Sequence, residues 1–385
     1  MKCTNCFKSI FSILFLFTTT ILVAQEEKKS QSLFTDSIGK AIDISNWLID
    51  AHGFFPLASI ITEPALGNIG IAVAPIFMHP KKRFLSDTTI KGKPKYVPPD
   101  ITAGVLMYTG NNSWGIAGMR RGSWLKQKIR YQLAGGYFNI NMAFYRETSL
   151  GEHKYNFNFK AVPIYGHAIR RIGLSHWYAG IQYVFANVDV GIDALPAFVQ
   201  NKEVSSIISA PGLIAEYDAR DNMFSPNKGL KFHVNALGSS NVFGSDFNYT
   251  HINSFAYYYF PVCRNVVGGL RLDYQQMLGN APFFMIPYID MRGLPVMRYQ
   301  GNVTLLSEAE ARWDFYKRWS AVFFGGVGNA FNDWDKMNDA QWAYSGGAGF
   351  RYLIASKFKL RVGMDLARGP EQWAYYIVFG SAWIK

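Results

Sequence analysis

The side chains with the clearest capacity for chemistry are an arginine in a loop and a row of charged residues on the strand that follows it. Arg292 precedes Gly293 within 279–301, a segment whose glycines and prolines predict a long loop. From position 303 onward, charged and apolar residues alternate, so that one face of a strand is apolar and the other is charged. The charged face carries Glu308, Glu310, Arg312 and Asp314. In a soluble domain the apolar face would point inward, whereas here we expect the charged face to be the inner one.

Signatures of enzymes are missing from the sequence. The seven histidines are scattered, without the pairs at helical spacing that bind metals. The Gly-x-Ser-x-Gly motif of serine hydrolases does not occur. Gly326 and Gly328 lie in an expected strand, without the helix that a phosphate-binding loop needs. We therefore expect no enzymatic activity, no metal and no cofactor.

The same inverted alternation recurs on other segments. Leu270 and Leu272, for example, alternate with Arg271 and Asp273. Aromatic residues make up 16% of the chain and charged residues 17%, and no apolar run after residue 24 is long enough for a membrane helix. Apolar residues facing lipid and polar residues facing a lumen are typical of outer-membrane barrels. The sequence therefore predicts an all-β fold, a single transmembrane antiparallel barrel, and a secreted β-sandwich is the alternative.

Turn residues divide the chain after residue 67 into fifteen strand segments, the last of them at 373–384. Closed bacterial barrels made from one chain normally have an even number of strands, and we expect the missing strand within 191–209. Sixteen strands is the prediction and fourteen is the alternative. Short turns such as 111–113 alternate with long loops such as 79–99 and 279–301, which predicts one end with tight turns and one with long loops.

The N-terminal part of the chain reads as an export signal followed by a short segment before the barrel. Residues 1–24 combine Lys2 and Lys8 with an apolar core and a small residue at Ala24, as a cleaved signal peptide does, and a membrane anchor is the alternative. In 25–67 we expect a short periplasmic helix over 36–50 and an irregular connector after it. The barrel is expected at 68–385.

The charge balance points to anionic partners at a membrane. The formal charge is +12, and removing the two lysines of the signal leaves +10. Much of the excess lies in 79–99, which fits phosphate-bearing lipid head groups, and a solvated basic loop is the alternative. Nucleic acid is not an expected partner of an exported chain.

Three motifs in order along the chain resemble one family. The first is a strand end at 217–222 with acidic and basic residues, followed by a turn. The second is Met-Arg-Gly-Leu at 291–294, and the third is Gly-Gly-Ala-Gly-Phe-Arg at 346–351. The chain resembles the BamA/TamA/FhaC superfamily of outer-membrane barrels, of the bacterial surface antigen type, over about 212–385. It is similar to a subgroup that lacks POTRA domains, since 25–67 offers no room for one. The turn motif consists of Asp218, Arg220, Asp221, Pro226 and Gly229.

The resemblance implies roles for particular residues. In the family, the loop arginine folds back into the lumen and contacts inward carboxylates, so Arg292 and Gly293 are expected to pin the loop. A guanidinium fork fits carboxylates in two-point contact, and glycine permits a close backbone approach. The candidate partners are Glu308, Glu310 and Asp365, and the expected C-terminal assembly signal consists of Tyr375, Phe379 and Trp383, with Lys385 where such signals usually end on an apolar residue.

The function that the resemblance implies is assistance in inserting or translocating proteins, or lipids, at the bacterial outer membrane. Both termini are then periplasmic, and the strands at 68–78 and 373–384 form the seam that can part. The expected partners are outer-membrane lipids and lipopolysaccharide, client outer-membrane proteins, and periplasmic or lipoprotein subunits. A passive channel, or a membrane scaffold for partner subunits, is the alternative.

Overall fold

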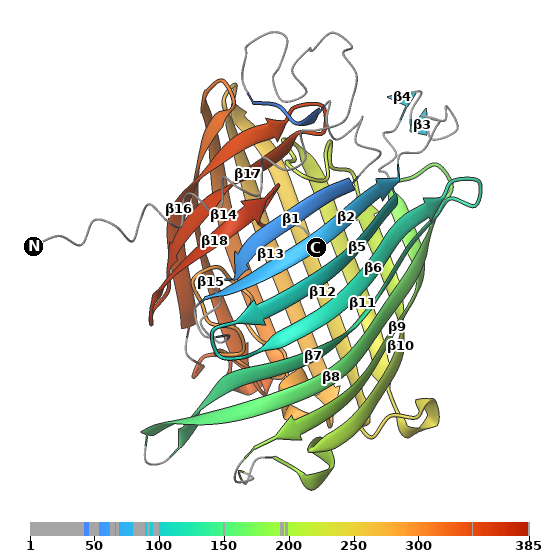
Figure 1. Ribbon diagram of the computed structural model, residues 1–385, viewed down its shortest axis with the longest axis vertical. Helices are drawn as coiled ribbons and strands as arrows, with labels where there is room; N and C mark the ends of the chain where they lie inside the picture. The colour runs from blue at the N-terminus through green and yellow to red at the C-terminus, as the bar shows by residue number, and fades with distance from the viewer. Residues whose placement is uncertain are drawn as a thin grey trace, which may run out of the picture.

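The computed structural model describes residues 42–45, 54–61, 66, 69–79, 89–90, 93–94, 100–148, 151–192, 196, 199–340 and 342–383. A single 16-stranded antiparallel sheet curls into a barrel with tilted strands (Figure 1). Each strand pairs with the next one along the chain, so the topology is a simple meander. This confirms the predicted all-β barrel and its strand number. The strands are β1 (Phe54–Ile61), β2 (Gly70–His79), β5 (Asp100–Thr109), β6 (Trp114–Trp124), β7 (Ile129–Thr148), β8 (Gly151–Arg171), β9 (Trp177–Gly191), β10 (Ser205–Asp218), β11 (Gly229–Ser239), β12 (Tyr249–Cys263), β13 (Val266–Gly279), β14 (Val303–Tyr316), β15 (Trp319–Phe331), β16 (Trp342–Ala355), β17 (Leu360–Arg368) and β18 (Trp373–Phe379).

Short elements lie outside the barrel wall. Strands β3 (Thr89–Ile90) and β4 (Lys93–Pro94) pair in a separate two-stranded sheet between β2 and β5. Among the elements whose bounds are described, four 3₁₀ turns lie in loops: η3 (Asn201–Glu203), η4 (Asn241–Phe243), η5 (Phe283–Met285) and η6 (Trp334–Lys336). Within the described ranges, no helix is long and apolar enough to cross a membrane.

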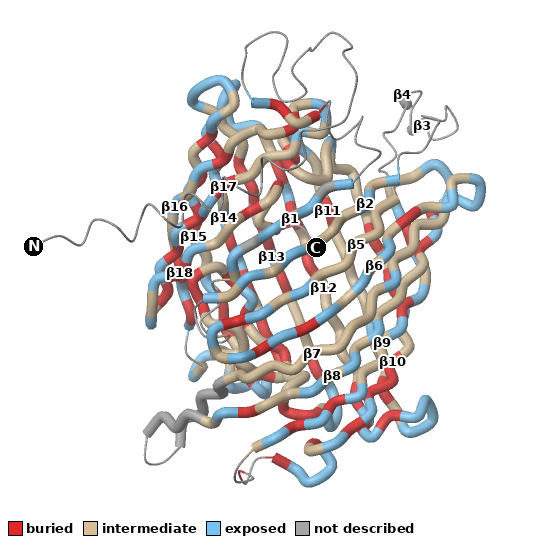
Figure 2. The backbone as a smooth tube through the Cα atoms, viewed as in Figure 1, coloured by how far each residue is buried: buried red, intermediate tan, exposed pale blue. Residues whose placement is uncertain are grey.

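The barrel is apolar outside and polar inside. Leucine, isoleucine and phenylalanine side chains lie exposed on the outer surface, among them Leu213, Leu272 and Phe323, while charged side chains such as Glu308 and Asp365 are buried. Exposed and less exposed positions alternate along the strands (Figure 2). An exposed apolar band with a polar interior is the arrangement that a hydrocarbon surrounding stabilises.

Exposed aromatic residues form two belts, one near each end of the barrel. Such belts mark the two interfaces of a membrane, where an amphipathic ring meets head groups. One belt comprises Tyr108, Trp114, Trp342, Tyr344 and Trp373, and the other comprises Trp124, Trp177, Trp313, Tyr316 and Trp319.

The two ends differ, although not as the turn pattern predicted. One end, which we call the loop end, holds the loops after β9, β11, β13 and β15 together with the short turn at 111–113. The other end, which we call the terminal end, holds residues 42–45, the end of β18 and the tight turns after β14 and β16. The long segment between β2 and β5 also lies at the terminal end, so loop length alone does not separate the ends. Apart from the backbone of β3 and β4, that basic segment lies outside the described residues.

Three expectations about strands are wrong. The segment 53–67 contains β1, so the barrel sheet begins before position 68, and β1 supplies the sixteenth strand. The described part of 191–209 holds no additional strand, because β10 simply begins early, at Ser205. The last strand ends at Phe379 instead of 384. The helix expected over 36–50 lies outside the described residues, apart from 42–45.

Candidate functional site

The β13–β14 loop (280–302) enters the lumen and places one arginine among three carboxylates. Arg292 Nε and Nη2 donate to Glu308 Oε1 at 3.0 and 2.6 Å. Nη2 also donates to Glu310 Oε2 at 2.8 Å, and Nη1 donates to Asp365 Oδ2 at 2.7 Å. The guanidinium carbon lies 3.6 Å from the ring centroid of Phe324. All three carboxylates that the resemblance suggested therefore contact this arginine.

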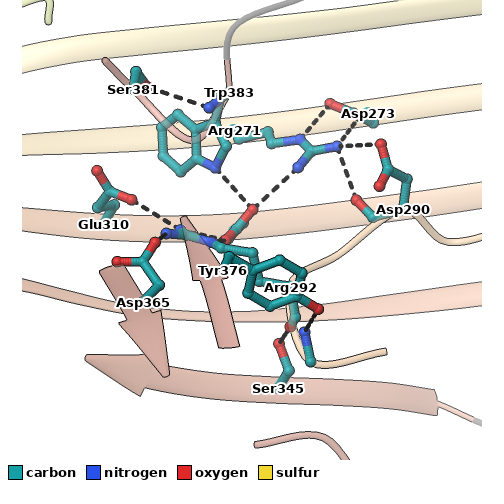
Figure 3. Close-up of polar contacts among 12 residues, drawn as sticks. Arg271, Asp273, Asp290, Arg292, Glu310, Ser345, Asp365, Tyr376, Ser381 and Trp383 are labelled. Carbon is teal, nitrogen blue, oxygen red and sulfur yellow. Dashed lines mark hydrogen bonds and ion pairs between the residues drawn. The ribbon is translucent and has the colours of Figure 1, made fainter. Parts of the chain in front are cut away.

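Glu308 connects the loop to two other parts of the barrel. Its Oε2 accepts from Arg271 Nη1 at 3.2 Å and from the indole Nε1 of Trp383 at 2.8 Å. Arg271 also donates to both oxygens of Asp273 and to the backbone oxygen of Asp290 in the loop. Glu308 is only 2% exposed, so each oxygen is satisfied by protein donors, as a buried charge requires. Figure 3 shows this network around the loop.

The backbone around Arg292 is held as firmly as its side chain. Gly293 has φ +92°, a conformation that disfavours any other residue, and a Cβ there would lie 3.1 Å from Gly369 N. The Gly293 N–H donates to Tyr376 Oη at 2.9 Å, and Ser345 Oγ donates to the Arg292 carbonyl at 2.5 Å. These two partners come from β18 and β16. The loop is therefore fastened to the last strands of the sheet as well as to β14.

The glycine run of β16 makes room for the carboxylate on β17. Gly349 pairs with Asp365, and a Cβ on Gly349 would overlap the Asp365 carboxylate. Arg351, on the same face, donates to both oxygens of Asp365 at 2.6 and 2.9 Å. Asp365 is 1% exposed and is thus shared between Arg351 and Arg292. The motif at 346–351 positions one anchor of the loop.

The other end of the β13–β14 loop packs on the opposite wall through apolar side chains. Phe283 is buried against Phe157, Val188 and Val190 on β8 and β9. Its backbone N–H donates to Glu203 Oε1 at 2.8 Å, and Glu203 is itself buried in the β9–β10 loop. The loop therefore crosses the lumen, with an apolar anchor on β8–β9 and an ionic anchor on β14–β17.

The chain after β18 turns into the lumen instead of continuing the strand. Gly380 has φ +79°, and Ser381 N donates to Phe224 O at 2.5 Å. Trp383 is 2% exposed and packs against Tyr257 and Tyr259. The expectation that Trp383 lies on the last strand is therefore wrong. Tyr375 does face outward on β18, and Phe379 is the last residue of that strand.

The motif residues of the β10–β11 turn are held by one another and by β14. Arg220 forms an ion pair with Asp218 at 3.0 Å, and Asp221 Oδ1 accepts from the backbone N–H of Asn227 at 2.9 Å. The carbonyl of Pro226 accepts from Arg312 Nη1 at 3.3 Å. Gly229, with φ +114°, starts β11. Strands β12 and β13 separate β11 from β14 in the sheet, so the turn folds across the terminal end of the lumen to reach it.

Residues 42–45 dock on the same end. Asp43 Oδ2 accepts from Arg318 Nη2 at 2.8 Å and from Ser356 Oγ at 2.5 Å, and Ile44 N donates to Ile354 O at 2.9 Å. Burial raises the pKa of Asp43, but hydrogen bonds from Ser356, Ser45 and Arg318 outweigh it and hold that pKa well below its usual value. The segment before β1 is thus tied to the turns after β14 and β16.

The sheet has one seam. Strand β18 lies beside β1 (Figure 1), but no ladder hydrogen bonds join the described residues of these two strands, unlike every other neighbouring pair in the barrel. The predicted seam between 68–78 and 373–384 is corrected accordingly to β1 and β18. In the described part of the chain, no group of histidine, cysteine and acidic residues is arranged to hold a metal.

Solved structures share this architecture. The BamA barrel from Haemophilus ducreyi lacking POTRA domains 1–3 matches 85% of this chain and 69% of its own, with a TM-score of 0.56 at 11% identity. CdiB from Escherichia coli matches 84% of this chain with a TM-score of 0.55 at 8% identity, and CdiB from Acinetobacter baumannii matches 85% with 0.53 at 9%. The chain has the barrel fold of BamA and CdiB. The matches span 62% and 59% of the two CdiB chains. No family model and no curated protein matches the sequence.

Part of the site was beyond sequence reasoning. Arg271 and Asp273 were visible as inward residues of their strand, but nothing in the sequence paired them with the loop. Phe324, Ser345 and Tyr376 carry no local signal, because their contacts depend on where the loop comes to rest.

Proposed function

We propose that this protein is an outer-membrane barrel that assists the insertion or translocation of proteins or lipids, and that it acts through the β1–β18 seam. The observation that carries the proposal is that the described residues of β1 and β18 form no paired ladder. Every unpaired backbone group in hydrocarbon costs free energy, so an open strand edge is a site where another strand or an amphiphile can be received. The fold shared with BamA and CdiB supports the same class of activity.

The anchors around Arg292 would give the seam a defined resting state. The loop contacts Tyr376 on β18, which borders the seam, and Asp365 on β17, which pairs with β18. Trp383, which follows β18, shares Glu308 with Arg292. Movement of β18 away from the barrel would therefore disturb the loop network. In this proposal the terminal end faces the periplasm, both termini lie there, and periplasmic or lipoprotein subunits dock near residues 42–45.

The contents of the lumen argue against a passive channel. The β13–β14 loop crosses the lumen between two walls, and the β10–β11 turn and the Trp383 tail contact each other at the terminal end. Conductance through this barrel would require at least one of these segments to move.

A disulfide across the seam tests the proposal. In a Cys263→Ser background, cysteine pairs are placed between β1 and β18, and client insertion into membranes is compared in the oxidised and reduced protein. We expect oxidation to abolish insertion and reduction to restore it. The matched control joins β2 to β5 through Ala72→Cys and Met107→Cys, positions that already face each other in a paired ladder. Equal insertion by the locked and unlocked seam would refute lateral opening.

A further inference from the structure

The inner wall formed by β2, β5 and β6 is apolar, although it faces the lumen. Met107 and Ala117 point to the same side as Ala72 and Met119, because residues paired across an antiparallel ladder share a face. The β13–β14 loop packs against other strands, and no buried core cluster of the described residues includes a side chain from this wall. The wall residues are all partly exposed: Ala72, Ala74, Ile76, Met78, Ile101, Ala103, Val105, Met107, Ala117 and Met119.

This wall ends in a row of hydrogen-bond donors. Arg121 pairs with Gln132, Gln132 pairs with His167, and His167 pairs with Gln182, so that four inward side chains form one continuous row across β6, β7, β8 and β9. The row contains no carboxylate. Arg121 lies three positions before Trp124, which belongs to the aromatic belt at the terminal end. The row is therefore at the depth of lipid head groups.

Cations outnumber carboxylates on this side of the lumen and not on the other. On β13–β17 the described arginines and carboxylates that pair with one another are equal in number once Arg292 of the loop is included. The arginines are Arg271, Arg292, Arg312, Arg351 and Arg361, and the carboxylates are Asp273, Glu308, Glu310, Asp314 and Asp365. Among the described side chains of β6–β11 and the turn after β10, the inward cations are Arg121, Arg130, Arg171, Arg220 and Lys231, and the inward carboxylates are Glu216 and Asp218.

Several donors near the row lack partners. Arg121 makes no hydrogen bond or ion pair with any residue that the structure describes, whereas the inward carboxylate of Glu216 is contacted by Arg130, Lys231 and His233. Gln182 is 4% exposed, and its Nε2 has no hydrogen-bond partner among the described residues. The same holds for Nη2 of Arg171, which is 6% exposed and lies four positions beyond His167 on β8. A buried donor without a partner is costly, so the orphaned Nε2 of Gln182 within the row indicates a missing acceptor there.

We propose that the lumen holds a phosphate-bearing lipid, with its phosphate at the row formed by Arg121, Gln132, His167 and Gln182 and its acyl chain on the apolar inner wall of β2, β5 and β6. A phosphate supplies several strong acceptors and a negative charge to a row that contains an arginine and no carboxylate. The acyl chain covers apolar side chains that the described residues leave partly exposed.

A lipid suits this wall better than a polypeptide does. A peptide would bring its own backbone N–H and C=O groups, and the inner face of a sheet offers none in return, because its backbone groups are already used in the ladders. An acyl chain needs no hydrogen-bond partner. The inference goes beyond the proposed function, because a lipid can occupy this wall whether or not the seam opens.

Photo-crosslinking that distinguishes inward from outward residues along β6 tests the proposal. The full mature protein is reconstituted with phosphatidylglycerol that carries a diazirine on its acyl chain, and labelled residues are mapped by mass spectrometry. Lipid always touches outward Ile116 and Gly118, so their labelling is the internal reference. We expect additional labelling of inward Ala117 and Met119, and a lower inward-to-outward ratio for a diacylglycerol probe with the same chain but no phosphate.

Adjacent arginines on opposite faces of β6 provide the matched variants. Arg121→Gln should lower the inward-to-outward ratio about tenfold, the effect of losing one charge-assisted hydrogen bond. Arg120→Gln removes the same charge from the outer face, where Arg120 contacts Thr102 and Tyr131, and should leave the ratio unchanged. Heat-dependent gel migration checks that each variant is folded, and the head-group comparison needs no variant.

Three outcomes would overturn the proposal. Labelling confined to outward residues would show that no lipid enters the lumen. Inward labelling that ignores both the head group and Arg121→Gln would show unspecific partitioning. A photoreactive amino acid at position 117 that captures protease-sensitive conjugates and no lipid would assign the wall to a polypeptide. None of these depends on the seam disulfide, so the two proposals can fail separately.

Discussion

Replacing Arg292 with alanine should release the β13–β14 loop without unfolding the barrel. Arg292 donates four hydrogen bonds to the buried carboxylates of Glu308 and Asp365 and the half-buried carboxylate of Glu310. Breaking a buried ion pair costs about 3–5 kcal/mol when the remaining charge is left alone. Here Glu308 keeps Arg271 and Trp383, and Asp365 keeps Arg351. Glu310 loses the one ion pair that it makes within the described residues. We therefore place the loss of loop stability at the lower limit, about 3 kcal/mol.

Hydrogen exchange of loop peptides reads this value directly, because local opening exposes the amides of 286–300 while the strands stay protected. A loss of about 3 kcal/mol corresponds to exchange about 100-fold faster in the loop. Arg292→Lys keeps the charge but not the planar fork, and should give an intermediate rate. Arg298→Ala removes a half-exposed arginine of the same loop that contacts Glu371 at 3.4 Å, and should change the rate little. If exchange in Arg292→Ala matched that in Arg298→Ala, the ionic anchor would carry no energy and the reasoning would be wrong.

Other consequences can be measured separately. Phe283→Ala should speed hydrogen exchange in the first half of the loop, because emptying a buried phenylalanine site costs about 3–5 kcal/mol. Amides next to Arg292 should change less. Equal effects on both halves would mean that the loop has one anchor and not two. Trp383→Phe replaces the indole with a smaller aromatic ring and removes the hydrogen bond to Glu308. It should make the C-terminus more sensitive to carboxypeptidase, and unchanged digestion would be the contrary result. Asp43→Asn should free 42–45 for proteolysis. Because the pKa of Asp43 is depressed in the folded protein, the stability that Asp43 contributes is complete above the unfolded pKa of about 4 and is lost only as the pH falls below that value. Faster digestion of 42–45 in the unmodified protein at about pH 5 than at about pH 7 would contradict this.

Local sequence patterns predicted the wall of the barrel well. Alternation of leucine with arginine or aspartate on β13, and of apolar residues with glutamate on β14, tells which side chains share a face, because the period of a strand is two whatever its neighbours are. β1 escaped prediction because Pro56 and Pro64 suggested a connector. Pro56 faces Pro75 across the ladder, and proline is tolerated on an edge strand, which β1 is.

The C-terminal segment shows the limit of local patterns. Aromatic alternation predicted a strand through residue 384, and it correctly placed Tyr375 on the outer face. A left-handed glycine at 380 ends the strand, and Trp383 finds a hydrogen-bond acceptor on Glu308, 75 positions earlier in the sequence. A buried indole N–H needs an acceptor, but the sequence does not say which one is near.

By itself, the sequence determined that the chain forms a barrel with an apolar outer face, and that an arginine and a glycine lie together in a long loop before a strand with inward carboxylates. These are local properties, set by alternation and turn residues. The tertiary structure decided which carboxylates surround Arg292, that the loop is also anchored by Phe283 on the opposite wall, and that the seam lies between β1 and β18. It also decided that an uncovered apolar wall ends in a donor row from four strands. Those features depend on strand register and on the closure of the sheet, which join residues far apart in the chain.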